Sequence, residues 1–91
     1  MQFRWNERKN DFLKTERNIS FERILVALQE GDLLDVLEHP NSEKYAGQRL
    51  YVLNIDNYAW VVPFRDSGDS RILITAFPSR KYTSVYLKEE G

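Results

Sequence analysis

The sequence predicts a single α+β domain in which a pair of helices packs on a small antiparallel sheet and a short helix ends the chain. Apolar residues recur at helical spacing in the first third of the chain. The remainder is rich in β-branched and aromatic residues and is divided by turn-forming residues. The chain has 91 residues with no repeat and no linker-like tract. We therefore expect one two-layer domain that spans residues 1–91.

The N-terminal segment predicts a short strand followed by a helix. Residues 2–5 alternate polar and apolar side chains, as a half-buried strand does. Asn6 is a suitable N-cap, and Glu7 then lies in the first turn, where the helix dipole favours an acid. The predicted helix over 7–17 carries few apolar side chains, so it depends on packing against the rest of the protein. Asn18 can end it, because asparagine tolerates the left-handed conformation.

The second helix, over 20–30, has the clearest pattern. Ser20 is a good N-cap, and Ile19 and Ile24 are placed to form a hydrophobic staple across it. Gly31 supplies the C-terminal stop. About two residues separate the two helices, which predicts a tight αα-hairpin. The predicted buried face, at positions i, i+3, i+4 and i+7, consists of Phe21, Ile24, Leu25 and Leu28.

Short strands are expected in most of the rest of the chain. Asp56 and Asn57 suit a two-residue hairpin turn, because both residue types tolerate positive φ. Pro63 lacks an amide proton, so its strand should be at an edge or bulged there. The segments predicted as strands are 33–37, 49–55, 58–64 and 71–77.

A final helix is expected after the last strand. Pro78 breaks that strand, and Ser79 can cap a helix with Tyr82, Val85 and Tyr86 on one face.

Composition excludes several classes of function. Thirteen basic and fourteen acidic residues give a net charge of −1, which argues against a generally basic nucleic-acid binder but not against a local basic patch. The absence of cysteine excludes a disulfide scaffold and a thiolate metal site. A single histidine, His39, excludes a multi-histidine metal site and suits a turn before Pro40. No apolar run is long enough to span a membrane and no secretory leader is apparent, so we expect a cytoplasmic protein.

Charge is unevenly distributed along the chain, and two groups of cations stand out. Arg80 and Lys81 precede Tyr82 at the predicted start of the last helix, with Arg65 expected nearby. Cations beside an aromatic ring at a helix start suit a phosphate and a stacked base. The alternative is an ordinary charged helix start with a core-facing tyrosine. The second group is interleaved with acids, so it also suits a solvated helix face; it consists of Arg4, Arg8, Lys9, Lys14 and Arg17.

Two further features admit a plain structural explanation. Asp32, Asp35 and Glu38 are close in sequence, but a strand would place them on alternating faces, so we expect no metal site and no cofactor. The large aromatic residues outside the helices either fill the core or form a patch for a protein partner. These residues are Trp5, Tyr51, Tyr58 and Trp60.

Several short motifs resemble the BrnT family of bacterial toxins. Residues 3–9 read F-R-W-N-E-R-K, residues 19–22 read I-S-F-E, and residues 61–64 and 71–76 read V-V-P-F and R-I-L-I-T-A. The resemblance covers almost the whole chain. It implies a RelE-like fold and a ribonuclease toxin of a type II toxin–antitoxin pair. It also implies a small ribbon-helix-helix antitoxin that contacts operator DNA on behalf of the complex.

The chain departs from the family pattern at two places. Residues 16–18 read E-R-N where the family often has K-H-G, and Phe77 stands where an arginine usually follows the strand. Two alternatives to an active toxin therefore remain. One is a catalytically weak or inactive protein of the same ancestry that binds the antitoxin as a co-repressor. The other is an unrelated small α+β binding module.

A nuclease of this composition would work without a metal. The 2′-OH of RNA attacks the adjacent phosphate, which requires a proton acceptor, cations for the phosphorane and a proton donor for the leaving 5′-oxygen. Glu22 is a remote candidate for the acceptor. Arginine suits the phosphate because its guanidinium presents a planar fork of donors. The predicted catalytic residues are Arg65, Arg80, Lys81 and Tyr82, and the predicted RNA-binding residues are Lys9, Lys14, Arg71 and Tyr86.

Overall fold

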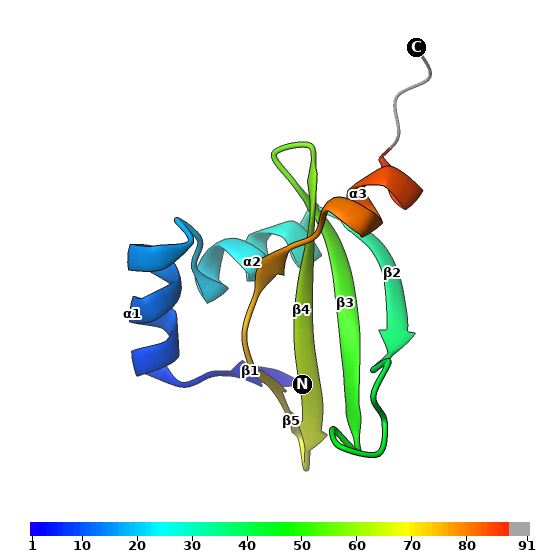
Figure 1. Cartoon of the computed structure of the whole chain (residues 1–91). Coiled ribbons are helices and arrows are strands. Elements are labelled where there is room, and N and C mark those ends of the chain that lie inside the picture. Colours follow the sequence, from blue (N-terminus) through cyan, green and yellow to red (C-terminus); the bar gives the residue numbers. More distant parts are fainter. Residues whose placement is uncertain (88–91) are drawn as a thin grey trace.

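The computed structural model describes residues 1–87, and this part of the chain forms an α+β structure of three helices and six strands (Figure 1). The element order agrees with the order predicted from the sequence, except that the last predicted strand is divided into two. None of the helices is long and apolar enough to cross a membrane. The elements are β1 (Gln2–Arg4), α1 (Glu7–Glu16), α2 (Phe21–Gln29), β2 (Leu33–Glu38), β3 (Gln48–Ile55), β4 (Tyr58–Ser67), β5 (Ser70–Leu73), β6 (Phe77–Pro78) and α3 (Arg80–Tyr86).

The sheet is mixed, so the prediction of a purely antiparallel sheet is wrong. Its strands are ordered β1-β5-β4-β3-β2, and β6 pairs with β4 beside β5. β1 runs parallel to β5, with Phe3 opposite Arg71, whereas the other pairs are antiparallel. The antiparallel pairs joined by tight turns follow from local sequence. β1 pairs with a strand some 68 positions away, from Gln2 to Ser70, and no turn between them sets its direction.

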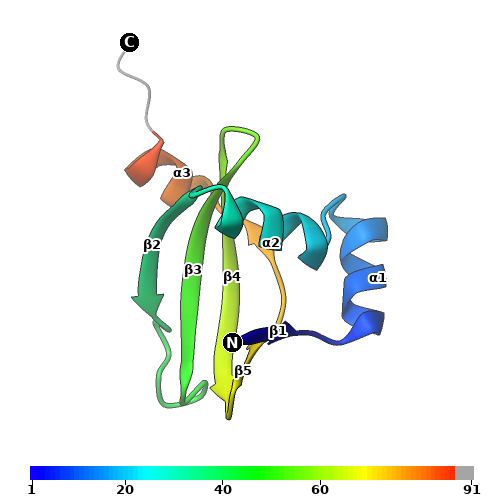
Figure 2. The same ribbon diagram turned by 180° about the vertical axis from the view of Figure 1, so that it is seen from behind.

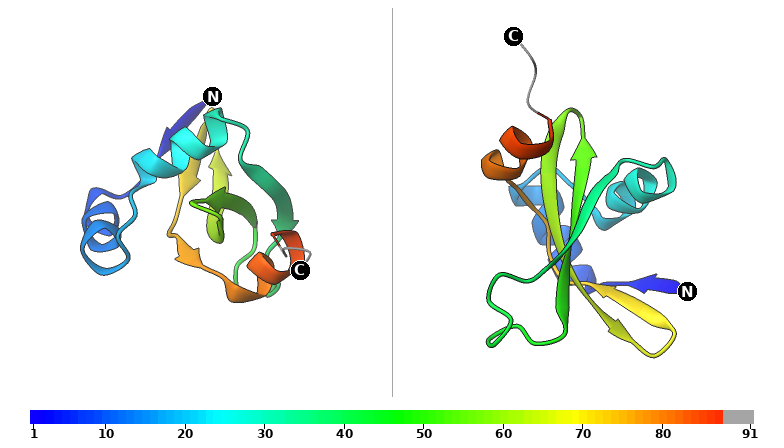
Figure 3. Two further views of the ribbon diagram at one scale, coloured as in Figure 1. Left: turned by 90° about the horizontal axis from the view of Figure 1, so that it is seen from above. Right: turned by 90° about the vertical axis from the view of Figure 1, so that its right-hand side faces the viewer.

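The helices α2 and α3 lie on opposite faces of the sheet (Figure 3, right). We call the face that carries α2 the inner face. Val62 and Phe64 of β4 belong to the core that includes residues of α2, and Trp60 packs against that core from the same face. Because side chains alternate along a strand, Ala59, Val61, Pro63 and Arg65 point to the other face, which we call the outer face. α1 lies beside the sheet, so only the second helix of the predicted pair crosses it (Figure 2).

The core under α2 differs slightly from the predicted one. Phe21 and Ile24 are fully buried, as expected. Leu25 and Leu28 are only partly buried, whereas Ala27 has no exposed surface. The buried stripe of α2 therefore runs through positions 21, 24 and 27. On α3, Val85 is 62% exposed, so the predicted face of that helix is only partly covered.

Polar side chains fix the helix ends as the sequence predicts. Asn6 Oδ1 accepts a hydrogen bond from the amide of Lys9 at 3.0 Å, and Ser20 Oγ accepts one from Arg23 at 3.0 Å. Ser79 Oγ caps α3 in the same way. These caps satisfy amide groups that have no partner within the helix.

A buried asparagine joins the two helices of the hairpin. Asn10 has no exposed surface; its Oδ1 accepts from the Phe21 amide at 2.8 Å, and its Nδ2 donates to Glu22 Oε1 at 2.8 Å. The hydrogen bond from Asn10 is the main cause of a lowered pKa of Glu22. Glu22 thus holds the helix pair together at the start of α2. Because α2 and α3 lie on opposite faces of the sheet, Glu22 is separated by the sheet from the cations of α3.

Pro63 lies in the middle of the sheet, which rules out the edge position, but the ladder beside it is irregular, as the other expected alternative requires. Its partner in β3 is Leu50, and its carbonyl accepts from the Ile74 amide at 2.9 Å on the other side. The ring nitrogen therefore faces residues 74–76, which run between β5 and β6 without pairing as a strand. The gap in the ladder accommodates the missing amide proton.

Candidate functional site

The start of α3 brings together the cations and aromatic rings predicted from the sequence. The helix is attached to the beginning of β4, since the Ser79 amide donates to the Ala59 carbonyl at 2.9 Å and the Ala59 amide donates to Thr83 Oγ1 at 2.8 Å. Arg80 and Lys81 are exposed, and Lys81 Nζ lies 5.4 Å from the centroid of the Tyr82 ring. The ring of Tyr86 follows one turn later, at a centroid distance of 6.1 Å from Tyr82.

Tyr86 also connects α3 to the edge strand β2. Its hydroxyl donates a hydrogen bond of 2.5 Å to Asp35 Oδ2, while Asp35 Oδ1 accepts from the Val36 amide at 2.8 Å. Asp35 lies opposite Val52 on the outer face. The hydrogen bond to the Asp35 carboxylate raises the pKa of Tyr86, so its phenol stays protonated. Its ring remains partly exposed. Asp35 is therefore a functional candidate that the sequence does not indicate, because its contact joins α3 to a strand 51 positions away.

Arg65 is at the opposite end of the outer face, so the expectation that it converges with Arg80 is wrong. Arg65 pairs with Gln48 and Ile72, six positions beyond Ala59 on β4. At about 3.3 Å per residue, roughly 20 Å of strand separates it from the start of α3. The reason is the route of the chain: after β5 it returns along β4, and β6 delivers α3 to the beginning of that strand.

The neighbour of Arg65 on this face is Arg4. Arg4 and Arg65 are the register partners of Ile72 from its two sides, so both side chains lie on the outer face. Adjacent strands are about 4.8 Å apart, which puts the two Cα atoms roughly 10 Å apart. No ion pair with a carboxylate of residues 1–87 involves Arg4, Arg65, Arg80 or Lys81. The sequence did not indicate this pair, because it depends on the long-range β1–β5 pairing.

Arg71 lies on the inner face, where a network already occupies its donors. Its Nε donates to Asp66 Oδ1 at 2.7 Å, and its Nη1 donates to the Tyr51 hydroxyl at 2.6 Å. Arg49 Nη2 donates to Asp66 Oδ2 at 2.8 Å. Hydrogen bonding to Arg71 is the main cause of a lowered pKa of Asp66, and it raises the pKa of Arg71 in turn.

The same network covers the aromatic core at this end of the sheet. The Phe64 ring is fully buried and lies 4.8 Å from the Cζ of Arg71 and 4.9 Å from the Cζ of Arg49. The Tyr51 ring stacks on it at a centroid distance of 4.0 Å. The structure therefore separates Arg71 from the other predicted RNA-binding residues and engages it in packing.

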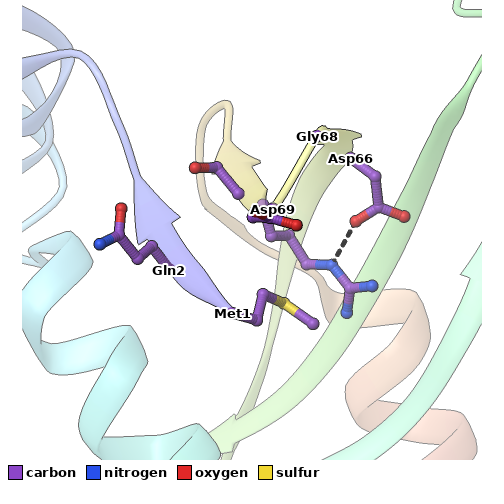
Figure 4. A pocket seen from close by; sticks show the side chains of 7 residues that line it. Met1, Gln2, Asp66, Gly68 and Asp69 are labelled. Atoms are coloured by element: carbon purple, nitrogen blue, oxygen red, sulfur yellow. Dashed lines mark hydrogen bonds and ion pairs between the residues drawn. The ribbon is translucent and has the colours of Figure 1, made fainter.

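A cavity of about 700 Å³ lies beside this network (Figure 4). Met1 and Gln2 of the N-terminal strand line one side, and Asp66 and Asp69 around the β4–β5 turn line the other. Its one arginine is already paired with Asp66, and Asp69 adds a further negative charge. The cavity thus has no unpaired side-chain cation to offer an anionic ligand.

The remaining predicted cations are on α1, away from the outer face. Lys9 Nζ lies 4.9 Å from the centroid of the Phe12 ring, and the Cζ of Arg17 lies 5.4 Å from the same centroid. Lys14 is exposed and lines a groove at the turn between α1 and α2. The structure thus distributes the predicted residues among α1, the two ends of the outer face and the inner face.

The lone histidine takes the place expected of a turn residue. His39 Nδ1 accepts from the Asn41 amide at 3.1 Å, and its ring lies 4.4 Å from the Tyr45 ring. Within residues 1–87, no three His, Asp or Glu side chains are grouped so that they could hold a metal ion. Comparison of the chain with protein-family models, with curated proteins and with solved structures finds no match.

Proposed function

We propose that this chain is the toxin of a type II toxin–antitoxin pair, a metal-independent endoribonuclease with a RelE-like fold that acts in the cytoplasm. Cleavage of RNA would inhibit translation and growth until a ribbon-helix-helix antitoxin neutralises the toxin. The BrnT-like motifs support the family. The observation that carries the activity is the set of cations on the outer face that have no carboxylate partner within residues 1–87: Arg80 and Lys81 at one end, Arg4 and Arg65 at the other.

The two ends of the outer face have different roles in this proposal. Arg4 and Arg65 hold the backbone of the RNA, because exposed arginines bind phosphates without regard to sequence. Arg80 and Lys81 hold the phosphate that is cleaved. Tyr82, whose ring is partly exposed, stacks a base next to it. The distance of roughly 20 Å along β4 means that the two ends contact different phosphates of one strand.

The chemistry at the α3 end follows from the groups present there. The 2′-oxygen attacks phosphorus, the bond to the 5′-oxygen breaks, and the products are a cyclic phosphate and a 5′-hydroxyl. Arg80 and Lys81 offset the charge on the phosphorane. The hydroxyl of Tyr82 or Tyr86 donates the proton to the leaving oxygen. Asp35 is the carboxylate hydrogen-bonded to Tyr86 on this face, which makes it our candidate for the proton acceptor in place of Glu22.

The proposed partners follow from the same surface. RNA, free or on the ribosome, binds the outer face, and the antitoxin inhibits by covering its cations. Operator DNA is contacted only through the antitoxin, and no membrane is involved.

Induced expression with and without the neighbouring gene, followed by gels of total RNA, tests this proposal. We expect growth arrest and RNA fragments only when the neighbouring gene is absent. Arg80→Ala and Arg65→Ala should both reduce the arrest, whereas Arg8→Ala, at an exposed position on α1, should not. Arrest that persists undiminished in both variants would place the active site elsewhere.

The departures from the family pattern give one alternative, a non-catalytic co-repressor of the same ancestry. In that case the purified chain would bind the product of the neighbouring gene but would cut no RNA. Failure of both binding and cleavage would favour the unrelated binding module.

A further inference from the structure

A groove lies between the α1–α2 turn and the β3–β4 turn, at the same end of the sheet as α3 but on the inner-face side. It consists of two cavities of about 250 and 410 Å³ that share Asn18, Ile19 and Arg23 in their walls. We call it the hairpin groove. The larger volume is within the range of about 300–1,000 Å³ that is typical of small-ligand sites. Of the residues in its walls, Lys14 is one of the predicted RNA-binding residues, and Arg17 belongs to the second group of cations described above.

Three cations from the helix pair line this groove: Lys14 lines the smaller cavity, Arg17 the larger and Arg23 both. The Nη1 of Arg17 also donates to the Ala76 carbonyl at 2.6 Å, which leaves its other donors for a ligand. Lys14 comes from the last turn of α1, Arg17 caps that helix, and Arg23 belongs to the first turn of α2. The acidic residue in the walls is Asp56, whose side chain is 90% exposed. Its Oδ1 is 3.9 Å from Arg23 Nη2, which is too long for a hydrogen bond. The groove therefore has a positive charge that its own residues do not neutralise.

Arg23 has donor capacity that the described residues leave unused. Its Nη1 is buried and has no hydrogen-bond partner. Buried donors are nearly always paired in folded proteins, so Arg23 has capacity for an acceptor that the described residues do not supply. The amides at the start of α2 do not provide the binding, because the Phe21 amide donates to Asn10 and the Arg23 amide donates to Ser20. Side chains are thus the available donors.

Aromatic rings complete the groove. Tyr58 and Trp60 line the larger cavity from β4, and both are partly exposed. Rings next to cations suit a base next to a phosphate, since any base can stack on an aromatic face. An acidic peptide would use the cations but has no group that requires the rings.

We propose that the hairpin groove binds a phosphorylated nucleoside, either a free mononucleotide or one nucleotide of an RNA strand. The phosphate lies among Lys14, Arg17 and Arg23, and the base lies against Tyr58 or Trp60. This proposal does not depend on RNA cleavage at α3, and a chain without nuclease activity would still bind the nucleotide.

The fluorescence of Trp60 provides a direct measurement. Trp60 lines the groove and the other tryptophan, Trp5, does not, so a base that stacks in the groove should quench mainly Trp60. We would titrate the full chain with adenosine monophosphate, adenosine, inorganic phosphate and a single-stranded RNA pentanucleotide. Adenosine monophosphate should bind more tightly than adenosine or phosphate alone. Tighter binding of the pentanucleotide would identify RNA as the source of the nucleotide, and tighter binding of the monophosphate would identify a free nucleotide.

Matched variants locate the binding. Arg23→Gln should weaken nucleotide binding about tenfold or more, the usual effect of losing a hydrogen bond to a charged group. Lys14→Gln should weaken it less, and Arg8→Gln, outside the groove, should not change it. Thermal unfolding would verify each fold, and Lys14→Gln carries the test if Arg23→Gln does not fold. Absence of quenching, quenching that neither variant alters, or binding of a polyglutamate peptide in place of the nucleotides would overturn the proposal.

Discussion

The arginines of the inner and outer faces have the same chemistry but opposite surroundings. The side chain of Arg71 is 19% exposed, is bound to Asp66 and Tyr51, and covers the buried Phe64 ring. Arg65 is exposed one strand away, on the other face, and Arg80 is exposed at the start of α3. Burial of a charge requires partners, whereas an exposed cation without a partner costs the fold little. The difference indicates that the inner arginines stabilise the fold and that the outer ones are available for a ligand.

The largest expected effect is on activity at the outer face. Arg80→Ala should reduce RNA cleavage about 10²–10³-fold, the usual loss when one preorganised donor to the transition state is removed. Arg80→Lys should also be impaired, because an ammonium group cannot reproduce a bidentate contact. Rates of cleavage of a short RNA by the purified variants would measure this. Unchanged cleavage rates in Arg80→Ala would show that this outer-face arginine does not take part in RNA cleavage.

The next effect is on stability at the inner face. Arg71→Ala should lower the free energy of unfolding by about 1–2 kcal/mol, since it removes two hydrogen bonds and the cover over an aromatic core. Arg65→Ala, on the same sheet, should change it by less than about 0.5 kcal/mol. Urea unfolding of the two variants gives both values. Equal losses of unfolding free energy in the two variants would show that burial does not distinguish the inner arginines from the outer ones.

Most of the fold follows from short-range features of the sequence. The three caps at Asn6, Ser20 and Ser79, and the turn at Asp56 and Asn57 with φ of 53° and 64°, are as predicted. Each depends on a few neighbouring residues whose conformational preferences agree. The parallel pairing of β1 could not be predicted, because it joins residues 2–4 to residues 70–72 and no local preference specifies it.

The candidate site was less predictable, for the same reason. The cations and rings of α3 are neighbours in sequence, and the structure keeps them together. Arg65 was placed at the wrong end of the outer face because the return of the chain through β6 has no local signature. The Arg49–Asp66–Arg71 network depends on strand register: Asp66 lies directly opposite Arg71, and Arg49 lies opposite Phe64. Register follows only once the turns and strand ends are known.

The inner network should also make stability depend on pH. The folded-state pKa of Asp66 is lowered, so its contribution is present above the unfolded value of about 3.9 and is lost as pH falls through the folded value. The stability difference between the wild-type chain and Arg71→Ala should therefore be constant near neutral pH and should shrink below about pH 4. Urea unfolding from pH 7 to pH 3 would measure it. The free energy of unfolding of Arg65→Ala should follow that of the wild-type chain across this pH range. A difference between the wild-type chain and Arg71→Ala that grows on acidification would contradict the assignment of the pH dependence to Asp66.

The smallest expected effect separates the two arginines within the inner network itself. Arg49 shares Asp66 with Arg71, but the side chain of Arg49 is 37% exposed and that of Asp66 is 51% exposed. An exposed ion pair contributes little, and an exposed cation over a ring adds at most about 1 kcal/mol. Arg49→Ala should therefore lower the free energy of unfolding by less than about 1 kcal/mol, and added salt should reduce the loss further. Urea unfolding at low and at high salt would measure both quantities. A loss equal to that of Arg71→Ala would mean that Asp66 depends on both arginines equally and that burial is not what distinguishes them.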